Sequence, residues 1–279
     1  MKAPAFAYTR PASLGEVFDL LERYGEDTKL LAGGQSLIPA LNMRLSSPEL
    51  LIDITGITGL GGIRVEGGTV RIGALATHAE IGRSPEIAKL VPMLAQAVPH
   101  IAHAAIRNRG TLGGSLALAD PAAEYPACAL ALDATLVLAS RKGERRVKAE
   151  GFFKGLFETD LRPGEVLAAA EFAAATDGER SVFLELARRQ GDYAILGIAL
   201  HQRESDLRVA FLGAGATPVL AKNAMAAAEE SVAAAQAALA KDLHPPADLY
   251  HSSATKLHLA RVLLGRALAE LWNTKSKPH

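Results

Sequence analysis

Two pairs of adjacent glycines, each next to an apolar segment, constrain this chain more than any other feature of its sequence. Gly33 and Gly34 follow the apolar run 29–32, and Gly113 and Gly114 lie about eighty residues later. Adjacent glycines let a backbone turn sharply and approach a ligand closely, with successive N–H groups pointing to one place. Two such loops in one chain indicate a ligand that carries phosphates.

The first glycine loop joins a strand expected over 29–32 to a helix expected to begin near Leu37. Gln35 and Ser36 add side-chain donors, and the positive end of the helix would attract an anion. The loop therefore predicts a pyrophosphate cradle, and a simple strand-to-helix turn is the alternative. The candidate binding residues are Ala32, Gly33, Gly34, Gln35, Ser36 and Leu37.

The second glycine loop, residues 107–115, contains hydroxyl donors and is followed by carboxylates. Its candidate binding residues are Gly110, Thr111, Gly114 and Ser115. Asp120 and Glu124 come next, and their oxygens are suited to accept hydrogen bonds from ribose hydroxyls. Together the loops predict a cofactor with two phosphates, a ribose and a flat ring, held by backbone amides. The residues alone leave the identity of the nucleotide open.

Other nucleotide, hydrolase and metal motifs are incomplete. A dinucleotide fingerprint begins at Gly213, but Pro218 stands where its third glycine is needed. The chain has no Walker-type phosphate loop, and residues 34–38 resemble a nucleophile elbow that lacks its closing glycine. His100 and His103 are three residues apart without a third ligand nearby, so no metal site is expected.

Charge and cysteine content exclude several further classes. The 279 residues include 30 Lys+Arg, 30 Asp+Glu and one cysteine, Cys128. Balanced charge provides no basic surface for nucleic acid, and one thiol cannot form an internal disulfide or hold an iron–sulfur cluster. Three carboxylates interrupt the most apolar stretch, 117–139, so we expect no transmembrane segment and a cytoplasmic protein.

Strand and helix patterns change near residue 176. Before that point, the alternation of apolar and polar residues predicts hairpins over 63–72 and 135–148. Beyond it, three antiparallel strands are expected between 182 and 212, followed by helical runs over 223–243 and 253–272. This order predicts an α+β fold that ends in a smaller domain with a three-stranded antiparallel sheet and helices.

Four short segments occur in the order and spacing of one known family. They are Ala32 to Ser36, Ile72 to Ala74 with Thr77-His78, Arg107 to Ser115, and Arg188 to Ala194. Together they resemble the FAD-binding medium subunit of molybdenum hydroxylases, the carbon monoxide dehydrogenase and xanthine dehydrogenase family. The resemblance implies that residues 1–176 form the two-part, non-Rossmann FAD-binding domain of vanillyl-alcohol oxidase-like flavoproteins, divided near 55–60. Residues 177–279 would form that family's smaller C-terminal domain.

The same resemblance implies roles for particular residues. Residues 32–37 would bind the FAD pyrophosphate, Thr77 would lie near the cofactor, and the second glycine loop would contact the diphosphate side. Glu124 matches a position near the ribose, Leu167 one near the flavin ring, and Tyr193 one that packs against the isoalloxazine. Some members have Lys at the position of Glu185 and Asn at that of Ser115, differences that bear on flavin redox properties.

The function implied is electron transfer within a larger enzyme. In such complexes a large subunit binds the molybdopterin cofactor, a small subunit carries two [2Fe–2S] clusters, and this chain's FAD passes electrons to an external acceptor. No general acid or base is expected here, and the substrate belongs to another chain. A stand-alone FAD oxidase or reductase of the same fold and a nucleotide-binding module without redox activity are the alternatives.

Overall fold

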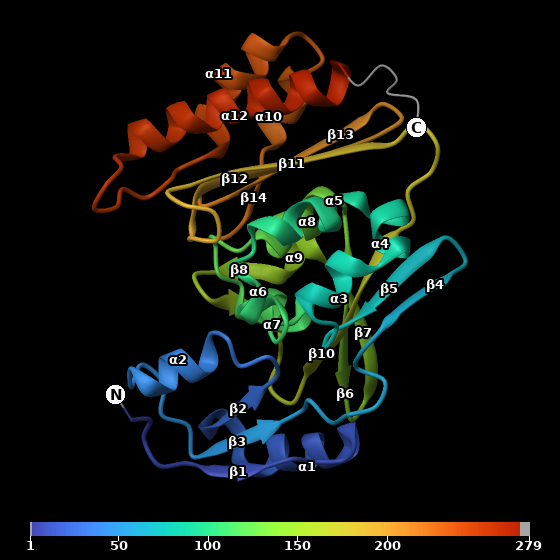
Figure 1. Ribbon diagram of the computed structural model, residues 1–279, viewed down its shortest axis with the longest axis vertical. Coiled ribbons are helices and arrows are strands. Elements are labelled where there is room, and N and C mark those ends of the chain that lie inside the picture. The colour runs from blue at the N-terminus through green and yellow to red at the C-terminus, as the bar shows by residue number, and fades with distance from the viewer. Residues whose placement is uncertain (1, 274–279) are drawn as a thin grey trace.

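The protein is arranged in three layers along its longest axis (Figure 1). The structure, a computed structural model, describes residues 2–273. A small parallel sheet with α1 and α2 forms the first layer, a five-stranded sheet with α3–α9 the second, and the sheet β11–β14 with α10–α12 the third. The chain passes from the first layer to the second through residues 54–62, and from the second to the third through residues 174–179.

The first layer contains the strand and helix that border the first glycine loop. Its parallel strands are ordered β1-β3-β2: β1 (Ala7–Thr9), β3 (Leu50–Asp53) and β2 (Thr28–Leu31). α1 (Leu14–Tyr24) begins where the Ser13 side chain accepts a hydrogen bond from the Glu16 N–H, and it buries Val17 and Phe18. α2 (Leu37–Asn42) begins at the predicted residue.

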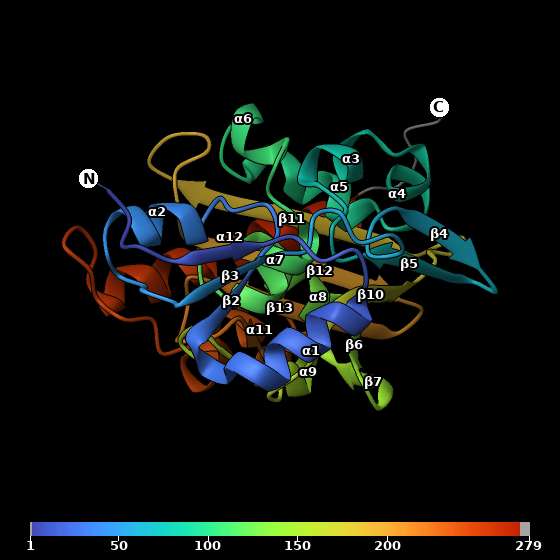
Figure 2. The same cartoon turned by 90° about the horizontal axis from the view of Figure 1, so that it is seen from below.

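The second layer is built on an antiparallel sheet ordered β4-β5-β10-β6-β7. Its strands are β4 (Ile63–Glu66), β5 (Thr69–Gly73), β10 (Val166–Ala173), β6 (Thr135–Ser140) and β7 (Gly143–Lys148). Both predicted hairpins are confirmed; Gly67 and Gly68 have φ of 55° and 77°, which suits the tight turn of the first. In Figure 2 this hairpin projects from one edge of the molecule.

Short helices pack on this sheet. They are α3 (His78–Arg83), α4 (Pro85–Leu90), α5 (Pro92–Ala97), α6 (Ala104–Arg107), α7 (Leu112–Leu118), α8 (Glu124–Ala131) and α9 (Ala149–Phe152), with a 3₁₀ turn over Val98–His100 and a two-stranded ribbon of β8 (Phe153–Gly155) and β9 (Glu158–Thr159). Within the described residues, no helix has the length and apolar character needed to cross a bilayer.

The third layer has four antiparallel strands, so the prediction of three was wrong. β11 (Arg180–Ala187), β12 (Ala194–Arg203) and β13 (Asp206–Leu212) are the predicted meander, and β14 (Val219–Leu220) adds a fourth strand beside β13. Three helices follow: α10 (Lys222–Ala227), α11 (Val232–Asp242) and α12 (Ser253–Asn273). The helical run predicted over 223–243 is therefore two helices, because Ser231 accepts a hydrogen bond from the Ala234 N–H and begins a new one.

The sheet of the third layer buries both of its faces. On β11, Val182 and its partly buried neighbour Leu184 pack with the core residues of α11 and α12. Phe183, on the opposite face, packs into the core of the second layer together with α8. Successive residues of a strand point to opposite faces of the sheet. Glu185 lies two residues after Phe183 and therefore points to the same side, the one on which α5 contacts β11.

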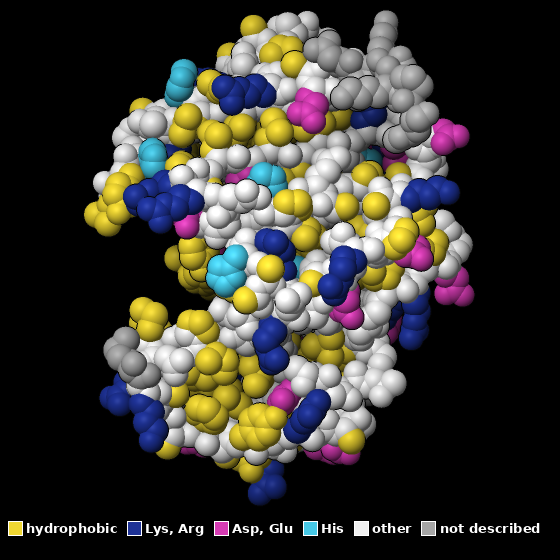
Figure 3. All heavy atoms as spheres, viewed as in Figure 1, with side chains coloured by type: hydrophobic (Ala, Val, Ile, Leu, Met, Phe, Trp, Pro, Cys, Tyr) yellow, Lys and Arg dark blue, Asp and Glu magenta, His cyan; other side chains and the backbone are white. Residues whose placement is uncertain are grey.

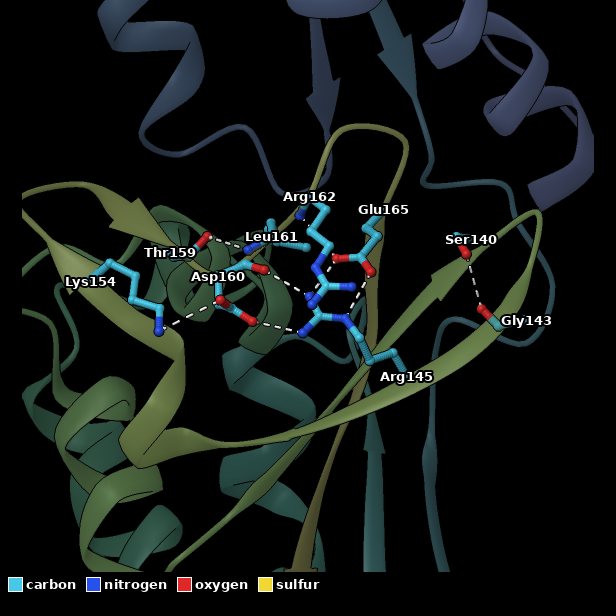
Figure 4. A network of polar contacts seen from close by, with 9 residues as sticks. All are labelled: Ser140, Gly143, Arg145, Lys154, Thr159, Asp160, Leu161, Arg162 and Glu165. Carbon is cyan, nitrogen blue, oxygen red and sulfur yellow. Dashed lines mark hydrogen bonds and ion pairs between the residues drawn. The ribbon is translucent and has the colours of Figure 1, made fainter.

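A network of ionic contacts ties β7 to the segment that precedes β10 (Figure 4). The Arg145 guanidinium donates to both carboxylate oxygens of Glu165, at 2.9 and 2.7 Å, and to the Asp160 carboxylate at 2.7 Å. Lys154 lies 3.5 Å from the same Asp160 side chain. The Glu165 side chain is only 8% exposed, so the network is partly buried.

Candidate functional site

The two glycine loops, distant in sequence, contact each other through their backbones. A Cβ atom at Gly33 would lie 2.2 Å from the Arg109 carbonyl oxygen and 2.8 Å from the Gly110 Cα. Both distances are shorter than van der Waals contact, and both partner atoms belong to the backbone. Only glycine therefore fits at position 33.

The first loop presents backbone donors that the protein itself leaves unused. Gly34 has a φ of 74°, which turns the chain, and the Gln35 side chain donates to the Gly33 carbonyl at 3.0 Å. Among the described residues, no acceptor pairs with the N–H groups of Gly34, Gln35 and Ser36. Successive free N–H groups next to a helix start form a concave site for an anion such as a diphosphate.

The second loop is held by hydrogen bonds to residues 74–78. Thr111 is the N-cap of α7 and accepts from the Gly114 N–H at 3.1 Å. It forms an isolated β-bridge with Thr77. Thr77 in turn caps α3, where it makes a complete capping box with Glu80. The structure thus brings together residues 32–37, Thr77 and the second loop, all of which the sequence had selected.

Glu124 occupies the first turn of α8, close to Asp120. Burial and the charge of Asp120 raise the pKa of Glu124 to about 7. Burial and the charge of Glu124 raise the pKa of Glu185, on β11, to about 8. The charge of a carboxyl group in the second layer thus acts on one in the third.

Tyr193 lies in the loop that joins β11 to β12. Its side chain is 78% exposed, but its pKa is raised by partial desolvation of the hydroxyl and by the charges of Asp120 and Glu124. The hydroxyl is therefore on the side of those carboxylates. A cavity of about 420 Å³ lies beside the loop, lined by His100, Glu185, Ala187 and Arg188–Gly191. Figure 3 shows a hollow at one edge of the molecule, between α2 and the third layer.

Leu167 does not point into open space. It is 5% exposed and belongs to the core of the second layer, at a β-bulge in β10. β10 packs against α7, the helix that the second glycine loop begins. Leu167 was predicted to lie near the flavin ring. In the structure it packs beneath the second glycine loop and does not form part of the accessible surface of that loop.

Three buried polar atoms near the second loop and α8 lack a partner among the described residues. They are His78 Nδ1, Tyr125 OH and Glu185 Oε2. The His78 and Tyr125 rings lie 5.2 Å apart, and burial together with the Arg107 charge lowers the pKa of His78 to about 4, so this histidine is neutral. Buried polar groups without partners are costly, and a polar cofactor suits such a donor and acceptor set.

The second loop packs against Ala74 and His78, which belong to another of the family's motifs but whose contact with the loop the sequence did not predict. A Cβ atom at Gly113 would lie 2.4 Å from the Cβ of Ala74, and one at Gly110 would lie 2.7 Å from the His78 ring. Small residues at 74, 110 and 113 thus keep the second loop close to α3. The glycine at 113 was visible in the motif, but its partner could be found only in three dimensions.

Most of the chain matches two known protein families. Residues 4–172 match the family described as FAD binding domain in molybdopterin dehydrogenase. Residues 181–271 match the CO dehydrogenase flavoprotein C-terminal domain.

Individual relatives cover nearly the full length. The carbon monoxide dehydrogenase medium chain of Hydrogenophaga pseudoflava is 37% identical over 98% of this chain and 99% of its own. Subunit alpha of the 6-hydroxypseudooxynicotine dehydrogenase complex of Paenarthrobacter nicotinovorans is 38% identical over 97% of this chain and 95% of its own.

Solved structures of related proteins have the same fold over nearly the whole chain. A carbon monoxide dehydrogenase chain from Hydrogenophaga pseudoflava superposes with a TM-score of 0.95 at 38% identity, covering 98% of this chain and 99% of that one. A quinoline 2-oxidoreductase chain from Pseudomonas putida 86 gives 0.91 at 37% identity, with the same coverage of both chains. The predicted α+β fold, an FAD-binding part followed by a C-terminal α+β part, is confirmed. The chain belongs to the FAD-binding medium subunits of the molybdenum hydroxylases, the family of carbon monoxide dehydrogenase and xanthine dehydrogenase, and is the flavoprotein subunit of a multi-subunit oxidoreductase.

Proposed function

We propose that the chain holds the FAD diphosphate where its two glycine loops meet. The observation that carries this proposal is the backbone contact between Gly33 and Arg109-Gly110, next to the unused N–H groups of Gly34 to Ser36. The loops donate hydrogen bonds to phosphate oxygens and orient the rest of the cofactor towards the third layer. FAD, when bound, supplies the ability to accept electrons and pass them on.

The remaining residues have supporting roles in this proposal. Glu124 accepts hydrogen bonds from the ribose region, and the Tyr193 ring covers the isoalloxazine from the loop between β11 and β12. The proposed cofactor-binding set is Ala32, Gly33, Gly34, Gln35, Ser36, Leu37, Thr77, Gly110, Thr111, Gly114, Ser115, Glu124 and Tyr193. Leu167, which is buried in the core of the second layer, supports the second loop from beneath. We assign residues 1–176 to the FAD-binding domain, divided near 55–60, and residues 177–279 to the C-terminal domain.

The partners in this proposal are a large molybdopterin-binding subunit and a small subunit with two [2Fe–2S] clusters. Clusters need several thiolates, and Cys128 is this chain's one cysteine and is buried. The clusters must then be held by another chain. Electrons would travel from the molybdenum centre through the clusters to FAD and on to an external acceptor, in a cytoplasmic complex.

Isolating the native complex and assaying its flavin, molybdenum, iron and acid-labile sulfide tests this function. We expect FAD to be present together with molybdenum and iron in co-purifying subunits. Flavin without any metal-containing partner would instead support a stand-alone flavoenzyme. A colourless preparation that releases no FAD would contradict both enzyme functions and leave a nucleotide-binding module.

Replacing Tyr193 by alanine tests the position of the flavin ring. A tyrosine ring stacked on the isoalloxazine quenches flavin fluorescence by electron transfer to the excited flavin, so Tyr193→Ala should raise the fluorescence of bound FAD. Tyr193→Trp, whose ring is also an electron donor, should keep it quenched. Tyr24→Ala, at the end of α1, serves as the control. If the fluorescence and absorbance of bound flavin are the same in Tyr193→Ala as in the unmodified protein, Tyr193 does not cover the ring.

A further inference from the structure

The loop between β11 and β12, residues 188–193, packs against the backbone that precedes α6. A Cβ atom at Gly191 would lie 2.7 Å from the Ala102 carbonyl oxygen and 3.0 Å from the carbonyl carbon. Gly191 also has a φ of 85°, so both the turn and the close approach require glycine. Figure 2 shows this loop beside α6. The position of the loop, which carries Tyr193, therefore depends on the backbone at Ala102.

The backbone at Ala102 has an unusual conformation that a neighbouring side chain supports. Its φ is 41°, in the left-handed region that residues other than glycine adopt at a cost. The Arg107 Nη1 donates a hydrogen bond to the Ala102 carbonyl at 2.8 Å and another to the Ile101 carbonyl at 2.9 Å. Hydrogen bonds from a charged donor are among the stronger ones in proteins. One guanidinium thus holds both carbonyl groups of the turn.

Arg107 belongs to the stretch that also contacts the first glycine loop. It is the last residue of α6 and the first of the second glycine loop. Two residues further on, the Arg109 carbonyl meets the backbone of Gly33. Residues 101–110 therefore contact the first glycine loop near one end and the loop of Tyr193 near the other.

The loop over 188–193 has a second attachment, which is more exposed. The Arg188 guanidinium lies 4.6 Å from the centre of the Tyr250 ring, in the segment between α11 and α12. Arg188 is exposed and Tyr250 is 69% exposed, and a cation–π contact in water contributes little. Gly191 and Ala102 are both half-buried. We therefore expect the contact at Ala102 to fix the loop more firmly than the contact at Tyr250.

We propose that Arg107 is a positioning residue for the flavin: by holding the carbonyls of Ile101 and Ala102, it fixes the surface on which Gly191 packs and so the place of the Tyr193 ring. The inference rests on the positions of FAD and Tyr193 proposed above. Arg107 acts on the flavin through Tyr193 and not by direct contact. The same stretch of chain thus sets the place of the flavin-covering loop relative to the glycine loops.

The first test measures the fluorescence per bound FAD in the purified protein with Arg107→Met. This side chain retains much of the arginine's apolar volume but donates no hydrogen bond. The loop should then leave its place, and the fluorescence should rise, by no more than it rises in Tyr193→Ala. Arg107→Lys, which keeps a charged donor, should retain more of the quenching than Arg107→Met. Equal quenching in Arg107→Met and the unmodified protein would contradict the proposal.

Gly191→Ala tests the same contact from the other side without changing any charge. The new Cβ would lie 2.7 Å from the Ala102 carbonyl oxygen, so the loop must move and the fluorescence should rise. Gly178→Ala is the matched control: Gly178 has a φ of 90°, but a Cβ there would meet nothing within 4 Å. Both substitutions strain the backbone, and only Gly191→Ala should alter the flavin. An equal response in the two variants would mean that the contact with Ala102 does not place the loop.

A double variant shows whether Arg107 acts through Tyr193. If it does, Arg107→Met combined with Tyr193→Ala should fluoresce as Tyr193→Ala does alone, because two changes on one route are not additive. A further rise in the double variant, of the same factor as in Arg107→Met alone, would show that Arg107 affects the flavin by another route. That result would overturn the proposal.

Trypsin cleavage after Arg189 tests the loop without any need for flavin. Arg189 is exposed, and cleavage in a folded chain follows the population in which the loop is open. The fragment that begins at Gln190 should form roughly tenfold faster or more in Arg107→Met, the factor that matches the loss of hydrogen bonds from a charged donor. Gly178→Ala should cleave at the unmodified rate.

The two kinds of measurement separate this inference from the proposed function. An unmodified protein without flavin contradicts the function, and the cleavage rates still decide whether Arg107 holds the loop. The cleavage rates decide in the same way if Arg107→Met loses its FAD. Unchanged cleavage after Arg189 in Arg107→Met contradicts the inference alone.

Discussion

Replacing Gly33 by valine is expected to lower the amount of FAD that the purified chain retains. The new Cβ would lie 2.2 Å from the Arg109 carbonyl oxygen and 2.8 Å from the Gly110 Cα. Both obstacles are backbone atoms, so the two glycine loops must separate, and overpacking of this kind costs about 1–3 kcal/mol. If that cost falls on cofactor binding, the affinity for FAD drops roughly 5- to 150-fold. The flavin released per mole of purified protein measures the effect.

Two glycine variants serve as controls for this experiment. A Cβ at Gly61 would meet nothing within 4 Å, so Gly61→Val should keep its flavin. A Cβ at Gly114 would meet only the Thr111 Oγ1, at 2.9 Å, so Gly114→Ala should lose less FAD than Gly33→Val. Circular dichroism should show that all variants remain folded. Full flavin content in Gly33→Val would mean that the cofactor does not bind where the loops meet.

Replacing Arg145 by methionine is expected to cause a large loss of stability, of about 2–3 kcal/mol in the free energy of unfolding. The Glu165 carboxylate, 8% exposed, would lose both hydrogen bonds from the guanidinium and keep only that from the Arg162 N–H at 2.9 Å. Chemical denaturation of the unmodified chain and the variant measures the difference. Arg141→Met provides the control, because Arg141 pairs with Asp19 and Glu22 at an exposed site, where ion pairs contribute little.

The stability difference should also depend on pH. Arg145 lowers the pKa of Glu165 below its usual value, so this carboxylate contributes stability above its unfolded-state pKa and loses that contribution as the pH falls through the folded-state pKa. The gap between the unmodified chain and Arg145→Met should therefore shrink on acidification. A gap that stays constant into the acidic range would show that Arg145 stabilises the fold by packing and not by charge.

Local sequence signals predicted most elements because they reflect local interactions. The alternating pattern predicted the hairpin over 63–72, which turns at Gly67-Gly68, and the first glycine loop predicted the start of α2 at Leu37. The pattern failed where local signals are weak. β14 has only two residues and no periodicity to detect, and the alanine-rich run after residue 222 has no apolar stripe that would show its interruption before Ser231.

The sequence predicted the residues of the site but not how they come together, again because it shows only local interactions. Motifs identified both glycine loops, but their contact depends on how the first layer docks on the second, which no spacing encodes. The effect of the Glu124 charge on Glu185 could not be predicted either, because 61 positions separate the two residues and they belong to different layers. Leu167 matched a family position, yet a β-bulge and the core decide where it points.

The burial of α8 between the second and third layers makes the two parts of the chain depend on each other. Seven of its eight residues are buried, between α5 and α7 on one side and strands β12 and β13 on the other. A gene that ended before β11 would encode a chain with this apolar helix open to water, and one that began there would encode a sheet without its cover. The two parts therefore share this helix, and either part made without the other should expose apolar surface and lose stability.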